Sequence, residues 1–171
     1  DKRHCRICLF AWYFRDWLMY RLDISLGYVV AGHDAGSEMA GETDLATLLA
    51  GMSPRLDDAE WMFVTLTEGD AQSLMPLAIA SFREEEGMTL VLPRSAGSDL
   101  GQAIGPMMRI TLEIHSSLEA VGLTAAVAGA LAADGISANV IAAYYHDHIF
   151  VPSASADRAL AILHKLSNSE C

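Results

Sequence analysis

Two short runs of the sequence contain residue types that could carry out chemistry. One is His115-Ser116-Ser117, and the other is His146-Asp147-His148 further along the chain. Imidazole and carboxylate groups can bind a metal ion or exchange protons, and a histidine beside a serine could activate its hydroxyl. On one strand His146 and His148 would share a face, whereas a turn would splay them. One candidate is therefore a small metal-dependent or acid-base enzyme that uses His115, His146, Asp147 and His148.

The second candidate site is the expected N-terminus of a helix that directly follows a strand. Arg109–Ile114 alternates apolar and polar residues, and Ser116-x-x-Glu119 has the capping-box spacing, which predicts a helix from about Ser117. Unpaired amides at such an end favour a carboxylate, and Gly122 leaves room for a ligand or a neighbouring element. The alternative stays open that Ser116 only caps its helix and that Gly122 only permits close packing.

Both runs lie in a predicted order of strand, helix, strand, strand and helix. Two adjacent apolar stripes predict that the first helix packs one broad face on a sheet. Strands are expected at Ser137–Tyr145 and Ile149–Val151, with the His-Asp-His run in or beside their turn, and a helix follows Pro152-Ser153. The stripes consist of Leu118, Val121, Ala125, Ala128 and Ala132, and of Leu123, Val127 and Leu131.

This order lacks a closing fourth strand, and a bare sheet edge pairs readily. The missing strand is expected from the first half of the chain or from a second subunit, which suggests an edge-to-edge dimer. The first half predicts a short helix at Asp44–Met52, with Thr43 or Asp44 as N-cap, and strands at Trp61–Leu66, Leu77–Phe82 and Met88–Leu92. The last two form a predicted hairpin, and a short helix could lie in the glycine-rich stretch from Ser95 to Pro106.

The composition limits the classes of partner. The chain has 171 residues and a formal net charge of −11, which argues against a nucleic-acid partner because phosphate binding needs clustered Lys and Arg. The hydrophobic fraction is 52% without a membrane-length apolar run, so no membrane partner is expected. Three cysteines do not make a disulfide framework, which predicts a cytoplasmic location. No cofactor is expected.

Residues 1–42 differ in composition from the rest. Cys5-Arg-Ile-Cys8 is half of a zinc or redox signature, and chance occurrence is the simpler interpretation because two further ligands are missing. The first good helix signal comes just after Met39. We therefore expect native translation to begin at or near Met39, with residues 1–38 as an over-extended start.

The run His115-Ser-Ser-Leu-Glu-Ala-Val-Gly-Leu-Thr-Ala-Ala126, followed by Gly135 to Val151, closely resembles the small bacterial ACT-domain proteins. These proteins are related in architecture to the cytosolic arginine sensors. The resemblance is strongest over residues 108–166 and extends more loosely through Leu45 to Leu92. It implies an α+β fold of ferredoxin-like βαββαβ ACT domains, with two ACT-like halves packed together: an extension at 1–42, a first half at 43–107 and an ACT domain at 108–171.

By this resemblance the chain is a regulatory or sensor protein that binds an amino acid or a similar small carboxylate at a paired-domain interface, as a homodimer and without catalysis. Two alternative hypotheses stay open: the enzyme described above, and a dimerisation module without a ligand. Neither a catalytic residue nor a metal ligand is assigned. The ligand-binding residues that the resemblance implies are His115, Ser116, Ser117, Leu118, Glu119, Val121, Gly122 and Leu123 in the loop, and Asn139, Val140 and Ile141 on the facing strand.

Overall fold

The computed structural model describes residues 41–168. The expected translation start at Met39 and the Cys5-x-x-Cys8 motif lie outside these residues. Within them no helix is both long enough and apolar enough to cross a membrane.

The elements in chain order are α1 (Leu45–Gly51), β1 (Pro54–Leu66), α2 (Glu68–Leu74), the 3-10 turn η1 (Met75–Leu77), β2 (Ala80–Glu84), β3 (Gly87–Pro93), α3 (Arg94–Gly97), β4 (Ala103–Leu112), α4 (Leu123–Ala133), β5 (Asn139–Ala142), β6 (Asp147–Pro152), the 3-10 turn η2 (Ser153–Ser155) and α5 (Ala156–Asn168).

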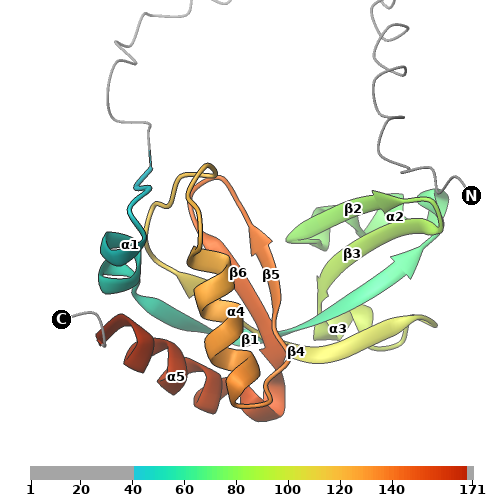
Figure 1. Cartoon of the computed structure of the whole chain (residues 1–171). Coiled ribbons are helices and arrows are strands. Elements are labelled where there is room, and N and C mark those ends of the chain that lie inside the picture. Colours follow the sequence, from blue (N-terminus) through green and yellow to red (C-terminus); the bar gives the residue numbers. More distant parts are fainter. Residues whose placement is uncertain (1–40, 169–171) are drawn as a thin grey trace, which may run out of the picture. The chain divides into compact units, whose positions relative to one another are not determined.

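The strands form one six-stranded sheet in the order β2-β3-β1-β4-β6-β5 (Figure 1). Every neighbouring pair is antiparallel. The expected hairpin is confirmed, since β2 and β3 pair from Ala80 opposite Val91 to Glu84 opposite Gly87. Its turn consists of Glu85 and Glu86, whose charges suit a solvated tip.

The two central strands are long because each serves two modules. Elements β1, α2, β2, β3, α3 and β4 make one βαββαβ unit, with sheet order β4-β1-β3-β2. Elements β4, α4, β5, β6 and α5 make most of a second unit, and the place of its closing strand beside β4 is taken by β1. Pro54, Arg55 and Leu56 of β1 pair with Leu112, Thr111 and Ile110 of β4. The missing strand therefore comes from the first half of the same chain, and the expected α+β ferredoxin-like fold is confirmed.

The register between β1 and β4 shifts where the two modules meet. One shift lies between Leu56 and Glu60, and another lies between Trp61 and Phe63. Gly105 of β4 lies opposite the second shift with a φ of 148°, and a Cβ there would come within 2.8 Å of the Trp61 carbonyl oxygen. A β-bulge bends a strand and increases its twist. Glycine therefore allows β4 to change register as it passes from one module to the other.

Three apolar clusters stabilise the described part of the chain. Helices α1, α4 and α5 cover the second unit through residues such as Leu48, Leu131 and Leu163, which pack on Ile110 and Ile149. A second cluster joins β1 and β3 to Ala71 of α2. The third contains strand residues alone, with Trp61, Val91 and Phe150 buried and Phe63 and Met107 beside them. We call this side of the sheet the strand-only face.

Two details of helix α4 contradict the sequence prediction. The helix begins at Leu123, not near Ser117, and Gly122 is its N-cap residue. Only the stripe of Leu123, Val127 and Leu131 is buried. Leu118 and Val121 precede the helix and are exposed by 66% and 83%. The predicted broad buried face is therefore wrong, and α4 buries a narrow one.

Candidate functional site

The loop between β4 and α4, residues 113–122, replaces the start of the predicted helix. The Glu42 amide donates to the His115 carbonyl oxygen at 3.0 Å, and the Ser117 amide donates to the Glu42 carbonyl oxygen at 2.9 Å. Gly41 approaches the same loop so closely that a Cβ would lie 2.5 Å from the Ser117 nitrogen. This backbone pairing holds residues 115–117 extended, and tertiary contacts thus override the local capping-box signal.

The side chains of the capping box have other partners. The Ser117 hydroxyl accepts from the Glu119 amide at 3.1 Å, a local turn that competes with helix formation. The Ser116 hydroxyl donates to Asp147 Oδ2 at 3.4 Å. Ser116 and Asp147 are both buried, each with 7% of its surface exposed. The serine predicted to cap a helix instead contacts a buried carboxylate at the start of β6.

Asp147 is an acid in an unfavourable place. Burial raises the pKa of its carboxyl above the ordinary value, and the Ser116 hydroxyl and the nearby His146 oppose that rise. Its hydrogen bond from Ser116 is long, so the carboxylate is incompletely compensated. A cationic group beside Asp147 would stabilise its charged form.

A cavity of about 60 Å³ lies beside these two side chains. Its walls come from the loop, from the first residues of α4, from the end of β5 and from the start of β6. The polar lining consists of Ser116, Ser117, Thr124 and Asp147, and the apolar lining consists of Leu118, Ala120, Leu123 and Ala142.

The first turn of α4 borders this cavity through Leu123 and Thr124. The N-cap is Gly122, and no side chain caps the helix. The first amides of a helix have no intrahelical partner and carry the positive end of its dipole. The cavity is therefore bounded by a buried carboxylate and by a helix end that attracts anions.

The structure brings together part of the predicted ligand-binding set. Ser116, Ser117, Leu118 and Leu123 line the cavity, whereas His115, Glu119, Val121 and Gly122 do not. Gly122 has a φ of 105°, and a Cβ there would meet Leu45 of α1 at 3.0 Å, so this glycine serves backbone geometry and helix packing.

On the facing strand the cavity reaches Ala142, one residue beyond the predicted Asn139, Val140 and Ile141. Ala120, Thr124 and Asp147 were missed as cavity residues. Asp147 was noticed in the sequence only as part of the His146-Asp147-His148 run, and its burial was not expected because acids are rarely buried.

The four residues of the alternative enzyme do not converge. Asp147 and His148 are consecutive residues of β6 and point to opposite faces. His148 Nδ1 pairs with the Thr111 hydroxyl at 3.0 Å, and His146 Nδ1 lies 3.3 Å from the Ile114 carbonyl oxygen. The His115 ring lies 5.2 Å from that of Tyr145. Within residues 41–168 no three His, Cys, Asp or Glu side chains are grouped as a metal site.

His148 has charged neighbours on the strand-only face. Burial is the main cause that lowers the pKa of its imidazole, and Arg109 is the next. Arg109 forms an ion pair with Asp57 at 2.8 Å and lies over the Trp61 ring at 5.3 Å. Arg109 therefore has an acidic partner and an aromatic partner on this face.

Comparison with known proteins places this geometry in a family. Models of the ACT domain match residues 40–104 and again residues 108–165. A Vibrio cholerae protein of unknown function, described as a possible transport protein, is 48% identical over 72% of this chain and 95% of its own, with a TM-score of 0.63. Comparison with functionally curated proteins gave no match.

More distant structures share the fold. The ligand-free regulatory subunit of aspartate kinase from Thermus thermophilus is 12% identical, covering 68% of this chain and 97% of its own, with a TM-score of 0.52. An Agrobacterium tumefaciens protein is 15% identical, covering 68% and 89%, with a TM-score of 0.55. The two consecutive ACT-domain matches together span most of the described residues 41–168. This chain belongs to the ACT-domain family and carries two ACT domains in tandem.

Proposed function

We propose that this protein is an amino-acid sensor whose ligand binds in the cavity between the 113–122 loop, α4, β5 and β6. ACT domains have regulatory, ligand-binding roles, which gives the general class of function. One observation carries the specific proposal: the Asp147 carboxylate and the uncapped end of α4 line the same cavity. An α-amino acid presents an ammonium and a carboxylate on one carbon, and each group has a complement here.

The ammonium group of the ligand is assigned to Asp147. A cation there offsets the desolvation that raises the pKa of this carboxyl. The ligand carboxylate is assigned to the amides at the start of α4, with the Ser117 and Thr124 hydroxyls as further donors. Asp147 would repel a ligand that carries only a carboxylate, so the site favours a zwitterion over a simple organic acid.

The size of the cavity limits how much of the ligand it holds. About 60 Å³ is far below the roughly 300–1,000 Å³ that encloses a drug-sized ligand. The cavity therefore suits the common ammonium and carboxylate end of an amino acid, and the ligand side chain extends outward past Leu118 and Ala142. Residues outside the cavity would then determine which amino acid binds.

A second copy of the chain is the proposed source of those residues. Strand β5 is one end of the six-stranded sheet, and its sequence Asn-Val-Ile-Ala has no charged side chain. The opposite end, β2, carries Arg83 and Glu84, and charged residues discourage edge pairing. A homodimer through β5 would place the partner beside Ala142. The cytoplasmic location expected from the cysteine content stays a prediction.

A thermal-shift titration of the full chain with each of the twenty amino acids tests the proposal. A ligand that binds the native state at 100 times its Kd adds about 2.7 kcal/mol to the free energy of unfolding, a rise of several degrees in Tm. Asp147→Asn keeps an oxygen that can accept from Ser116 but removes the charge, and it should weaken binding at least tenfold.

Asp157→Asn is the matched control, because Asp157 is exposed on α5 and does not line the cavity. Binding should be unchanged in this variant. The proposal fails if no amino acid raises Tm, or if Asp147→Asn binds the active amino acid as tightly as the wild type.

A further inference from the structure

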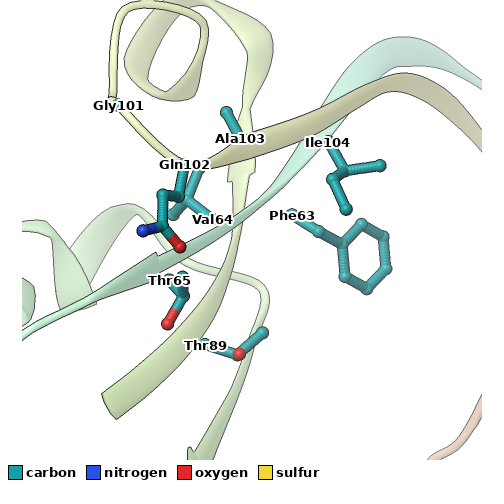
Figure 2. A pocket seen from close by; sticks show the side chains of 8 residues that line it. All are labelled: Phe63, Val64, Thr65, Thr89, Gly101, Gln102, Ala103 and Ile104. Carbon is teal, nitrogen blue, oxygen red and sulfur yellow. The ribbon is translucent and has the colours of Figure 1, made fainter. Parts of the chain in front are cut away.

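A larger cavity, of about 300 Å³, opens elsewhere, on the first ACT unit (Figure 2). It lies where β1, β3 and the start of β4 meet. Phe63, Thr65, Thr89 and Ile104 belong to the strand-only face by their pairing, since Phe63 lies opposite both Val91 and Ile104, and Thr65 lies opposite Thr89. The complete lining is Phe63, Val64, Thr65, Thr89, Gly101, Gln102, Ala103 and Ile104. None of these residues lines the Asp147 cavity.

The two sides of this cavity differ in chemistry. Figure 2 shows Phe63 and Ile104 together on one side, with the polar ends of Gln102, Thr65 and Thr89 on the other. Ile104 is 68% exposed, which is unusual for a branched aliphatic residue on a strand. Covering apolar surface is favourable, so a ring or branched chain that packs against Ile104 would be stabilised there.

The internal repeat indicates that this cavity is not a by-product of the fold. Thr65 pairs with Thr89 in the first unit as Thr111 pairs with His148 in the second, which makes Arg109 the counterpart of Phe63. In the second unit Arg109 forms an ion pair with Asp57, and His148 forms a hydrogen bond with Thr111, although the Arg109 Nε is buried without a partner. In the first unit, within residues 41–168, no side-chain hydrogen bond involves the exposed Gln102 amide or the half-buried Thr65 hydroxyl.

The charge of the lining and of its border selects against anions. All eight lining residues are uncharged, so an anion would lose hydration without an ionic partner. Thr89 donates its hydroxyl to the Glu84 carboxylate, which places a negative charge at the border. The formal net charge of −11 adds to the repulsion of anions. An amino acid with its free carboxylate is therefore a poor occupant.

We propose that this cavity is a second ligand site, which takes a small uncharged molecule with an apolar ring or branched chain and an amide or hydroxyl head. The apolar part of the ligand lies between Phe63 and Ile104, and its polar head forms hydrogen bonds with the Gln102 amide and the Thr65 hydroxyl. The volume is at the lower end of the roughly 300–1,000 Å³ of small-molecule sites, which suits one ring with a short polar group. This proposal is independent of the amino-acid site.

Benzamide is the probe that tests it, in an NMR titration of the full chain followed by backbone amide shifts. Benzoate has the same ring with a negative head. We expect saturable shifts clustered at residues 63–65, 89 and 101–104 with benzamide, and at least tenfold weaker binding of benzoate. The proposal is overturned if benzamide gives no saturable shifts, if its shifts cluster elsewhere, or if benzoate binds equally well.

Ile104→Ser removes the exposed apolar wall and should weaken benzamide binding about tenfold. Leu77→Ser is the matched control, because Leu77 is an aliphatic residue that is 50% exposed and lies outside the cavity. Gln102→Leu, in the loop before β4, removes the polar partner and provides a second variant if Ile104→Ser does not fold. Unchanged binding in whichever folded variant is measured contradicts the assignment.

Discussion

In the proposed amino-acid site, the buried carboxylate of Asp147 would combine a cost in stability with a use in binding. It is 7% exposed, its hydrogen bond from Ser116 is 3.4 Å long, and it borders a cavity. Burial without a full set of hydrogen-bond partners destabilises the charged carboxylate. A ligand ammonium beside it would offset the hydration that the carboxylate loses on folding. The same residue should therefore lower stability in the free protein and raise affinity for a zwitterion.

The pH dependence of stability tests the first half of this argument. Burial raises the pKa of Asp147 above its ordinary value of 3.8, so at a pH between the ordinary and the raised pKa the folded state binds more protons than the unfolded state. The free energy of unfolding therefore falls as the pH rises through this interval, and above the raised pKa the cost is fully present.

Asp147→Asn should remove this cost. We expect the variant to unfold at higher urea concentration than the wild type at pH 7, with a gain on the order of 1 kcal/mol, and to lose that advantage as the pH falls toward 3.8. Urea unfolding of both proteins from pH 3.5 to 8 measures the difference. A difference that grows toward acid pH would mean that the carboxylate is stabilised, not strained, in the folded protein.

The residue types of the site could be recognised in the sequence better than their arrangement could. Ser116, Ser117 and Leu123 were identified as ligand-loop residues and do line the cavity. Asp147 was grouped with His146 and His148, because the sequence did not settle whether this run lies on a strand, where Asp147 and His148 face opposite sides, or in a turn. The pairing of Glu42 with residues 115–117 is a contact between distant segments, and no local pattern announces it.

At the scale of elements, α4 illustrates a limit of the apolar stripe. Its sequence is rich in Leu, Val and Ala on all sides, so two stripes satisfied the spacing rule. Which stripe is buried depends on where the helix begins. Because the preceding loop pairs with Glu42, the helix begins only at Leu123, and Leu118 and Val121 of the first stripe lie outside it. By contrast, α1 was predicted well, since its Asp44 N-cap accepts from the Thr47 amide at 2.8 Å, as the local sequence indicated.

Two glycines of this region should respond in opposite directions to alanine. Gly122 has a φ of 105° and lies against Leu45, so Gly122→Ala should lower the free energy of unfolding by about 1–3 kcal/mol. Gly129 lies within α4, where a Cβ meets nothing within 4 Å, and Gly129→Ala should raise it by about 0.5–1 kcal/mol. Urea denaturation of both variants measures this pair. If the two variants change the free energy of unfolding equally, the positive φ at Gly122 is not the reason for a glycine there.

At the scale of the whole described chain, the two ACT units are joined by shared strands. Strand β1 closes the second unit and opens the first, and β4 does the reverse. The sequence predicted a second unit without its closing strand, and that strand was expected either from the first half of the chain or from a second subunit. The structure shows the first of these two outcomes. The register shifts at Glu60 and Phe63 were not predictable, because bulges depend on how two distant strands meet.

Shared strands predict that the two units unfold together. Leu90 of β3 is fully buried in the core of the first unit, so Leu90→Ala should cost about 2–5 kcal/mol. Since loss of the first unit releases β1 from β4, the amides of β6 and α5 in the second unit should lose the same free energy of protection. Native-state hydrogen exchange of the full chain, followed by mass spectrometry, measures this, with Leu77→Ala at an exposed position as control. If β6 and α5 keep wild-type protection in Leu90→Ala, the units are separate folding units in spite of their common strands.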